Sequence, residues 1–175
     1  MKSESIQLLP HRSDERLAEL VATSVLPKLA EISSVLDIGC GDGIVGEVIP
    51  KTWRYRGIDL SNASIYAQNN KDNRIRYADP EKLDRIIADC EPADIILLLD
   101  VLEHTKKFHE LLEVSTRLAS KYIVISLPNE LFFLDRINFL LGKEQPAHSL
   151  DLLNLPEGFK HQYIINMNKA RRILK

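Results

Sequence analysis

The stretch from Val35 to Gly43, which reads V-L-D-I-G-C-G-D-G, constrains the fold of this chain more than any other part of it. An apolar run ends in an acidic residue, and three glycines then alternate with other residues before a helical pattern begins. Glycine lacks a Cβ atom, so the backbone can turn sharply there and approach a bound molecule closely. The free N–H groups of the following helix face the same turn. The stretch therefore predicts a strand, a ligand-binding turn and a helix.

Strand and helix patterns alternate along the chain, as in a parallel sheet covered by helices on both faces. The predicted strands cover residues 34–38, 55–60, 74–78, 93–99 and 122–126. The predicted helices cover residues 13–29, 43–49, 61–69, 80–90 and 108–118. We expect a Rossmann-like, doubly wound α/β fold with a mostly parallel sheet.

Two acidic residues at predicted strand ends indicate what the turn binds. Asp37 lies beside the glycines, where its negative charge opposes a phosphate but suits a cationic amino group or a sulfonium. This favours S-adenosylmethionine as the ligand. Asp59 ends the second predicted strand, where a carboxylate can accept hydrogen bonds from both hydroxyls of a ribose.

A dinucleotide site is the alternative. Residues 41–46 match the pattern G-x-G-x-x-G, and Asp59 follows Gly41 at a distance close to that of a ribose-binding acid. That alignment requires the first strand to continue through Gly39 and Cys40 before it reaches the first glycine of the pattern. We therefore favour the adenosyl cofactor.

Three segments resemble class I, S-adenosylmethionine-dependent methyltransferases. They are residues 37–43, the strand end at 57–59, and residues 99–104, which read L-D-V-L-E-H. The third segment is similar to the methyltransferase-11 and -23 type, and residues 126–142 resemble methionine-biosynthesis and surface-glycan methyltransferases. The resemblance extends over residues 15–175. It implies methyl transfer from S-adenosylmethionine to a small-molecule or glycan-type acceptor.

The resemblance also assigns residues to the cofactor. Those expected to bind it are Asp37, Gly39, Cys40, Gly41, Asp59, Leu60, Tyr77, Ala78, Asp79, Leu99 and Asp100. Asp37, Gly39 and Gly41 would contact the methionine part, Asp59 the ribose and Asp79 the adenine edge. Leu99 and Asp100 would contact the other flank of the cofactor. Asp79 has an equally good alternative role, because an acid followed by Pro80 is a typical helix start.

Asp100 and His104 are the candidate catalytic residues. Asp100 follows an apolar strand, at the edge where ligands bind in open α/β sheets. A hydroxyl acceptor needs a base, and either side chain can serve, whereas a neutral amine needs none. His104 can instead simply open the next helix. The five histidines are scattered and neither cysteine has ligand spacing, so we expect no metal site.

The end of the chain departs from the family, which usually has seven strands. Nothing after Ser126 reads as two further strands, so we expect the final hairpin to be missing and the fifth strand to lie at an edge. An open edge could pair with another copy and form a homo-oligomer. We expect one domain over 1–175, with an N-terminal helical segment (1–32), a cofactor-binding core (33–126) and a helical cap (127–175).

An apolar helix is predicted from Leu131 to Leu141, and three interpretations of it are open. Packing over the open end of the sheet is the simplest. A substrate lid or a partner surface is the second, and a membrane-surface helix is the third, although no basic face lies nearby. A short basic helix is predicted over residues 168–175, with a solvated charged face.

Charge and composition exclude several classes of protein. Lys and Arg number 23 against 25 Asp and Glu, so no broad nucleic-acid-binding face is indicated. The apolar run Ile95–Leu99 is too short to span a bilayer, and residues 1–10 lack the apolar segment of a signal peptide. Two cysteines form no disulfide framework, so we expect a cytoplasmic protein without stable membrane association. An inactive cofactor-binding accessory module and an NAD-binding domain are the functional alternatives.

Overall fold

A computed structural model describes residues 15–60, 73–79, 82–143, 148 and 161–174. The predicted helix over 61–69, the residues Pro80 and Glu81, and most of the loop over 142–160 lie outside this range. Within the described part of the chain, no helix is long and apolar enough to cross a bilayer.

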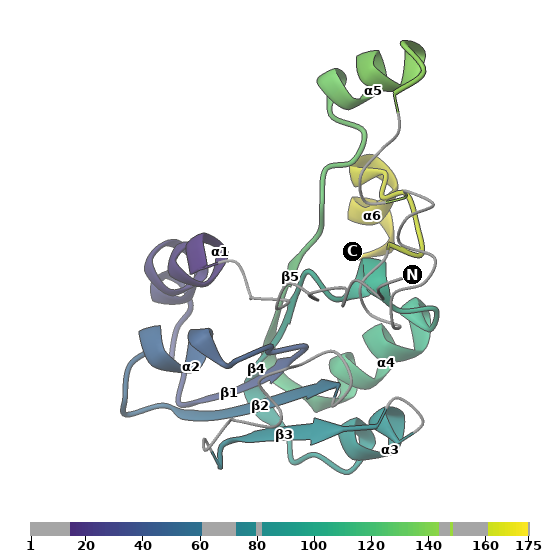
Figure 1. Ribbon diagram of the computed structural model, residues 1–175. Coiled ribbons are helices and arrows are strands. Elements are labelled where there is room, and N and C mark those ends of the chain that lie inside the picture. The colour runs from purple at the N-terminus through teal and green to yellow at the C-terminus, as the bar shows by residue number, and fades with distance from the viewer. Residues whose placement is uncertain (1–14, 61–72, 80–81, 144–147, 149–160, 175) are drawn as a thin grey trace, which may run out of the picture.

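Five parallel strands form one sheet in the order β3-β2-β1-β4-β5 (Figure 1). They are β1 (Ser34–Ile38), β2 (Arg54–Leu60), β3 (Ile75–Ala78), β4 (Ala93–Leu99) and β5 (Ala119–Ser126). The predicted Rossmann-like arrangement is confirmed. The strand order reverses between β1 and β4, which is where such sheets bind ligands.

Helices follow the strands in the predicted alternation. They are α1 (Glu15–Leu20), α2 (Ile44–Val48), α3 (Leu83–Ala88), α4 (Phe108–Leu118), α5 (Phe133–Leu140) and α6 (Met167–Ile173). The first predicted helix is less regular than expected, since a π turn at Val21–Val25 and a 3₁₀ turn at Leu26–Lys28 follow α1. Pro27 stands in that last turn, where it cannot donate the backbone hydrogen bond of a continuing helix.

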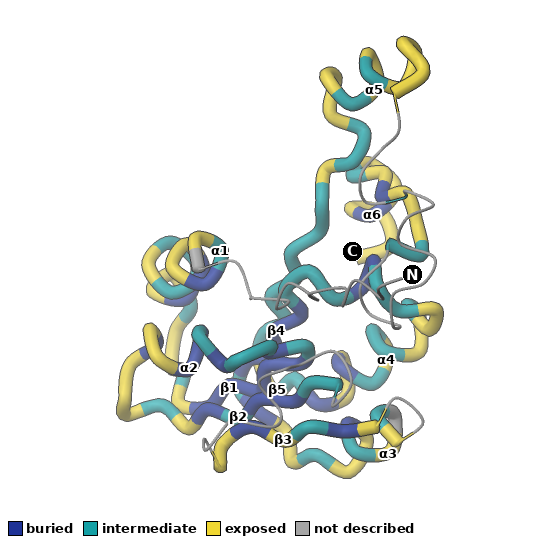
Figure 2. The backbone as a smooth tube through the Cα atoms, in the orientation of Figure 1, coloured by how far each residue is buried: buried dark blue, intermediate teal, exposed yellow. Residues whose placement is uncertain are grey.

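The sheet separates two hydrophobic cores, so its central strands are buried on both sides (Figure 2). Val35, Ile95 and Leu97 face one core, which the N-terminal helices and α2 complete. Leu36, Ile38 and neighbouring residues of β4 face the other, which α3 and α4 complete. This double burial explains the apolar run at the end of β4, where Ile95 to Leu99 are all apolar.

The predicted start of α3 at Asp79-Pro80 is wrong. The helix begins at Leu83, and Lys82 precedes it without a side-chain cap. Lys82 N–H donates to the Asp79 carbonyl at 2.9 Å, which makes a turn before the helix. Lys82, and not Asp79, therefore occupies the N-cap position of α3.

The apolar helix α5 does not pack over the sheet, contrary to the simplest interpretation of its sequence. None of its residues is buried, and Figure 1 shows it projecting away from the strands at the end of an extended connection. Phe133, Phe139 and Leu140 are all exposed. Residues 127–132 separate β5 from α5, and neither core includes a residue of the helix.

The described residues after β5 contain no strand, and β5 lies at an edge of the sheet as predicted. Residues 161–165, which carry a β-like pattern, form an irregular segment that leads into α6. Asn166 caps α6 by accepting from the N–H groups of Asn168 and Lys169. The predicted basic terminal helix is confirmed.

Asp94 ties the amino ends of the two central strands together, and its loss is expected to destabilise the domain. Its Oδ2 accepts from the N–H and hydroxyl groups of Ser33 and Ser34 at 2.8–3.2 Å. These hydrogen bonds, with a smaller contribution from Lys121, lower the pKa of Asp94 to about 2. We expect Asp94→Ala to reduce the free energy of unfolding at pH 7 by about 2 kcal/mol.

Urea unfolding of both proteins across pH checks this prediction. The carboxylate stabilises the fold above its unfolded pKa of 3.8, and this stabilisation is lost as the pH falls toward 2. The difference between wild type and variant should therefore narrow over that interval. Glu113→Ala, on the exposed side of α4, is the control and should change little. A constant difference across pH would contradict the assigned role of the charge.

Candidate active site

The glycine turn forms as the sequence predicts, directly after β1. Gly39, Gly41 and Gly43 all have positive φ angles, between 57° and 81°. Gly39 N–H donates to the Ile58 carbonyl at 2.7 Å, which joins the turn to β2. A Cβ atom at Gly39 would collide with Cγ2 of Val101, so the turn also packs closely against the segment that follows β4. The turn is thus held from both sides.

Asp37 is buried beside this turn, with 1% of its surface exposed. The Tyr55 hydroxyl donates to Asp37 Oδ2 at 2.8 Å. Burial raises the pKa of Asp37 to about 7, with the Tyr55 hydrogen bond opposing the shift and the nearby charge of Asp59 adding to it. Burial and the Asp37 charge also raise the pKa of Tyr55, so its hydroxyl keeps the proton that it donates.

Asp59 lies at the carboxyl end of β2 and contacts the turn directly. Its Oδ2 accepts from Gly41 N–H, and its Oδ1 accepts from Leu60 N–H at 2.6 Å. From β3, the Tyr77 hydroxyl donates to the Gly41 carbonyl at 3.0 Å. Four of the predicted cofactor residues therefore meet at one edge of the sheet.

Cys40 lies in the glycine turn, and its side chain is buried. Its side chain is buried in the first hydrophobic core, next to Gly57, where a Cβ would collide with the Cys40 sulfur. Burial, followed by the charges of Asp37 and Asp59, raises the pKa of the Cys40 thiol well above its usual range. The thiol packs inside the protein, so only the Cys40 backbone can face a ligand in the turn.

The remaining predicted cofactor residues also lie at carboxyl ends of strands. Ala78 ends β3 and is buried, and Asp79 follows it with an exposed carboxylate 3.2 Å from Lys82 Nζ. Leu99 ends β4 and pairs with Ser126 of β5. The sheet thus brings these residues to the same edge as the glycine turn.

Asp100 adopts a left-handed backbone conformation, with φ of 53°. Its N–H donates to the Ser126 hydroxyl at 2.8 Å, and that hydroxyl donates to Asp100 Oδ1 at 2.6 Å. Non-glycine residues held in this conformation are concentrated at functional sites. The geometry fixes the Asp100 carboxylate at the end of β4.

His104 belongs to a cluster of histidines and glutamates that sequence reasoning missed. The cluster is Glu103, His104, Glu130, His148 and His161. His104 and His161 stack edge to face with ring centres 4.7 Å apart. Glu130 Oε1 lies 2.6 Å from His161 Nδ1 and 2.8 Å from His148 Nε2. The expectation that the histidines are scattered is thus wrong for three of them, which come together from positions far apart in the chain.

Glu130 contacts two histidines of this cluster and the backbone of Ile165. Although burial alone would raise its pKa, hydrogen bonds from His161, the Ile165 N–H group and His148 lower the pKa of Glu130. The Ile165 N–H donates to Oε2 at 2.6 Å, and the Gln162 N–H donates to the Glu103 carbonyl at 2.6 Å. These contacts hold residues 161–165 against the segment that contains His104.

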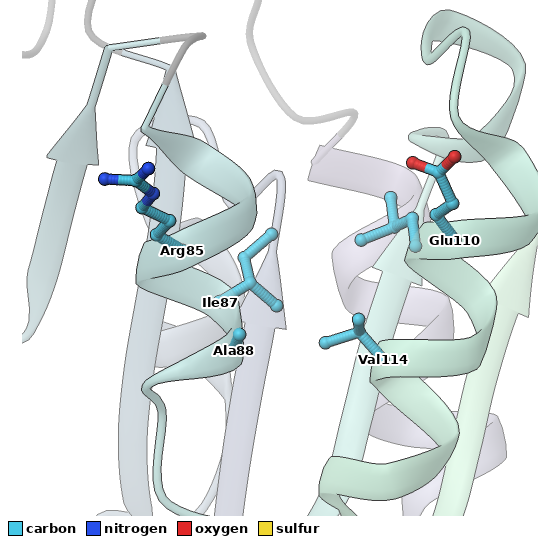
Figure 3. Close-up of a pocket in the computed structure, with 6 residues that line it drawn as sticks. Arg85, Ile87, Ala88, Glu110 and Val114 are labelled. Atoms are coloured by element: carbon cyan, nitrogen blue, oxygen red, sulfur yellow. The ribbon is translucent and has the colours of Figure 1, made fainter.

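A separate groove of about 300 Å³ lies between α3 and α4 (Figure 3). Ile87, Val114 and other apolar side chains line most of it, with Arg85 and Glu110 also present. Its lining comes from two helices of one sheet face and includes none of the residues predicted for the cofactor. We assign it no part in the site.

The sequence of the chain matches the profile of the family described as methyltransferase domain, over residues 9–164. The chain belongs to this methyltransferase domain family. The match covers β1 to β5 and the glycine turn, so the resemblance read from the three sequence segments is confirmed. A comparison with curated proteins found no significant match.

Solved structures of methyltransferases share the fold. An S-adenosylmethionine-dependent methyltransferase from Archaeoglobus fulgidus is 23% identical, with a TM-score of 0.60 over 91% of this chain and 66% of that one. The plantazolicin methyltransferase BpumL, in complex with a monoazolic desmethylPZN analog and S-adenosylhomocysteine, is 26% identical, with a TM-score of 0.52 over 74% and 51%. This methyltransferase domain therefore spans about half to two thirds of the length of these relatives.

The residues at the turn fit an adenosyl cofactor better than a dinucleotide. β1 ends at Ile38, so the strand does not continue through Gly39 and Cys40 as the dinucleotide alignment requires. Two carboxylates, Asp37 and Asp59, lie close enough for one to raise the pKa of the other. A pyrophosphate would add more negative charge there, whereas a cationic amino group or sulfonium would offset it.

Proposed function

We propose that this domain binds S-adenosylmethionine at the glycine turn and transfers its methyl group to a small-molecule or glycan-type acceptor. The observation that carries the proposal is the buried Asp37 beside a turn whose backbone is held by Asp59. Membership of the methyltransferase family supports it. Desolvation makes the Asp37 charge costly in the ligand-free protein, and a bound cation would relieve that cost.

The proposed contacts follow the order of the strands. Asp37, Gly39 and Gly41 would contact the methionine part, and Asp59 would accept hydrogen bonds from the ribose. Residues 77–79, at the end of β3, would flank the adenine. On the other side of the crevice, Leu99 and Asp100 would contact the cofactor from the end of β4.

The bound cofactor supplies a methyl group on a sulfonium, which is already activated for transfer. The chain then has to place the acceptor atom behind that methyl group, and such positioning is worth about 7–11 kcal/mol in favourable cases. For a hydroxyl acceptor, we propose Asp100 and His104 as the groups that take the proton. The fixed orientation of Asp100 by Ser126 supports its part in this role.

The acceptor class rests on the resemblance of residues 126–142 to methionine-biosynthesis and surface-glycan enzymes. A binding module without activity is the second candidate function. It is favoured by the position of α5, which projects from the domain and buries none of its residues.

Calorimetric titration with S-adenosylhomocysteine and, separately, with NAD tests the proposal. We expect S-adenosylhomocysteine to bind and Asp59→Ala to weaken it by roughly 10- to 150-fold, the value of one charged hydrogen bond. Asp89→Ala is the control, because this exposed residue follows α3 at the opposite edge of the sheet. Binding of NAD alone would overturn the proposal, and unchanged affinity in Asp59→Ala would overturn the site.

A second measurement separates an enzyme from a binding module. The protein is incubated with S-adenosylmethionine and a library of hydroxyl, amine and carboxyl acceptors, and release of S-adenosylhomocysteine is recorded. Turnover with a member of the library is the expected result. Tight binding with no turnover across all classes would favour the module.

A further inference from the structure

Next to His104 in the chain, Glu103 presents a buried carboxylate with one oxygen that no described residue satisfies. The residue is 1% exposed, and its Oε2 has no hydrogen-bond partner among the described residues. A buried oxygen without a hydrogen-bond partner destabilises the protein, and more so when the group is charged. Buried polar atoms of this kind commonly mark a missing water or ion.

Glu103 has ligand atoms of two histidines around it. One carboxylate oxygen of Glu103 and one ring nitrogen each of His104 and His161 all lie within 4.8 Å of one another. His104 and His161 come from segments separated by more than fifty residues, so this grouping is a product of the fold. One carboxylate and two imidazoles are a ligand set of catalytic zinc and non-haem iron sites.

Glu130 arranges His161 in the way that metal-binding histidines require. Its Oε1 lies 2.6 Å from His161 Nδ1, so a proton on that nitrogen leaves the lone pair of Nε2 for a metal. Histidines that bind a metal through one ring nitrogen typically donate the N–H of the other to a carboxylate. Glu130 is in turn fixed by His148 and the Ile165 N–H.

The negative charge around Glu103 also favours binding of a cation. The negative charges of Asp100 and Glu130 act on the buried Glu103 carboxylate. Imidazoles that coordinate a metal are neutral, so His104 and His161 would not offset these negative charges. A divalent ion would offset this negative charge.

We propose that Glu103, His104 and His161 bind one divalent transition-metal ion, such as Zn²⁺, with Glu130 as the positioning residue. Three protein ligands leave at least one coordination position open. An acceptor hydroxyl could enter there and lose its proton more readily, an extension that rests on the proposed function. His104 would then be a ligand, and the acceptor's proton would pass to Asp100.

Metal binding is measured on the full chain after treatment with a chelator and its removal. Titration with Zn²⁺ against a chromophoric chelator should give one ion per chain. Co²⁺ should give the visible absorption of a coordinated ion. Glu103→Gln and His161→Ala are expected to weaken Zn²⁺ binding at least about 100-fold, and Glu130→Gln about 10- to 100-fold with the stoichiometry kept. His109→Ala, an exposed histidine of α4, is the matched control and should bind like wild type.

The same proteins are titrated with S-adenosylhomocysteine, so the two proposals fail separately. A wild-type protein that binds S-adenosylhomocysteine but neither Zn²⁺ nor Co²⁺ would overturn the metal site alone. Metal binding that His161→Ala and Glu103→Gln leave intact, with unchanged circular dichroism, would likewise overturn it. Metal binding without cofactor binding would leave the metal site standing and remove the proposed function.

Discussion

Replacing Asp37 with asparagine is expected to stabilise the ligand-free protein at pH 8 and to weaken its binding of S-adenosylhomocysteine. Asparagine carries no charge to desolvate, and its Oδ1 can still accept the hydrogen bond from Tyr55. The cofactor's amino group, however, would lose its charged partner. We expect affinity to fall roughly 10- to 150-fold, equivalent to about 1.5–3 kcal/mol.

The stabilisation should depend on pH in a defined direction. Because the pKa of Asp37 is about 7 in the folded protein and 3.8 in the unfolded chain, only the folded protein holds this proton between those values. The free energy of unfolding of the wild type should fall by up to about 4 kcal/mol as the pH rises through that interval. Asp37→Asn should lack this fall, so its advantage appears at pH 8 and not at pH 4.

Urea unfolding at several pH values and calorimetric titration at pH 8 measure both effects. Tyr55→Phe is the complementary variant: it removes the hydrogen bond to the carboxylate and should lower the stability at pH 8. An Asp37→Asn protein that is less stable than wild type at pH 8 would contradict the assigned burial cost. Unchanged affinity would contradict the contact with the cofactor.

Gly39→Ala should be among the most damaging single substitutions in the chain. Its φ of +79° costs an L residue about 1–2 kcal/mol, and collision of the new Cβ with Val101 adds about 1–3 kcal/mol. We expect the free energy of unfolding to fall by about 2–5 kcal/mol. S-adenosylhomocysteine binding should weaken as well, because the turn must shift away from the segment after β4.

Gly142→Ala is the matched control, since Gly142 has a φ of +72° and nothing within 4 Å of a new Cβ. Only the backbone cost, about 1–2 kcal/mol, should appear there. Adding Val101→Ala to Gly39→Ala should recover part of the collision cost, and a double-mutant cycle by urea unfolding measures this coupling. Equal losses in the two glycine variants, or a cycle without coupling, would rule out the proposed contact.

The fold was predictable where burial controls the sequence pattern. β1 and β4 have the predicted bounds, and both of their faces are covered, so most of their residues are apolar. β5 begins three residues earlier than predicted, since an edge strand tolerates polar residues such as Ser120 and Lys121. The end of β5 was nevertheless correctly placed at Ser126.

The helices after Asp79 and Ser126 show where local patterns mislead. Acid followed by proline is a typical helix start, yet the chain makes a turn first and α3 begins at Leu83. The apolar spacing of α5 predicts a helix correctly but cannot say what it packs against. Its position depends on the extended connection after β5, which no periodicity encodes.

The candidate site also contains residues that the sequence predicts together and residues that it does not. Asp37 and Asp59 were expected together because the carboxyl ends of neighbouring parallel strands share an edge, and the structure places them so. His161 meets His104 only because Glu130 and the Ile165 N–H fix the returning chain. That contact joins distant positions with no common spacing, so a single sequence gives no signal for it.

The pairing of β1 with β4 has a consequence for how the domain assembles. Ser34 and Asp94 meet across about sixty residues of intervening chain, and closing so long a loop has an entropic cost that local helices do not share. Formation of the central pair should therefore be the slow, rate-determining event in folding. The glycine turn follows β1, and Val101 follows β4. The cofactor site therefore forms only after the two strands have paired, so the cofactor can bind only to chains in which this pair has formed.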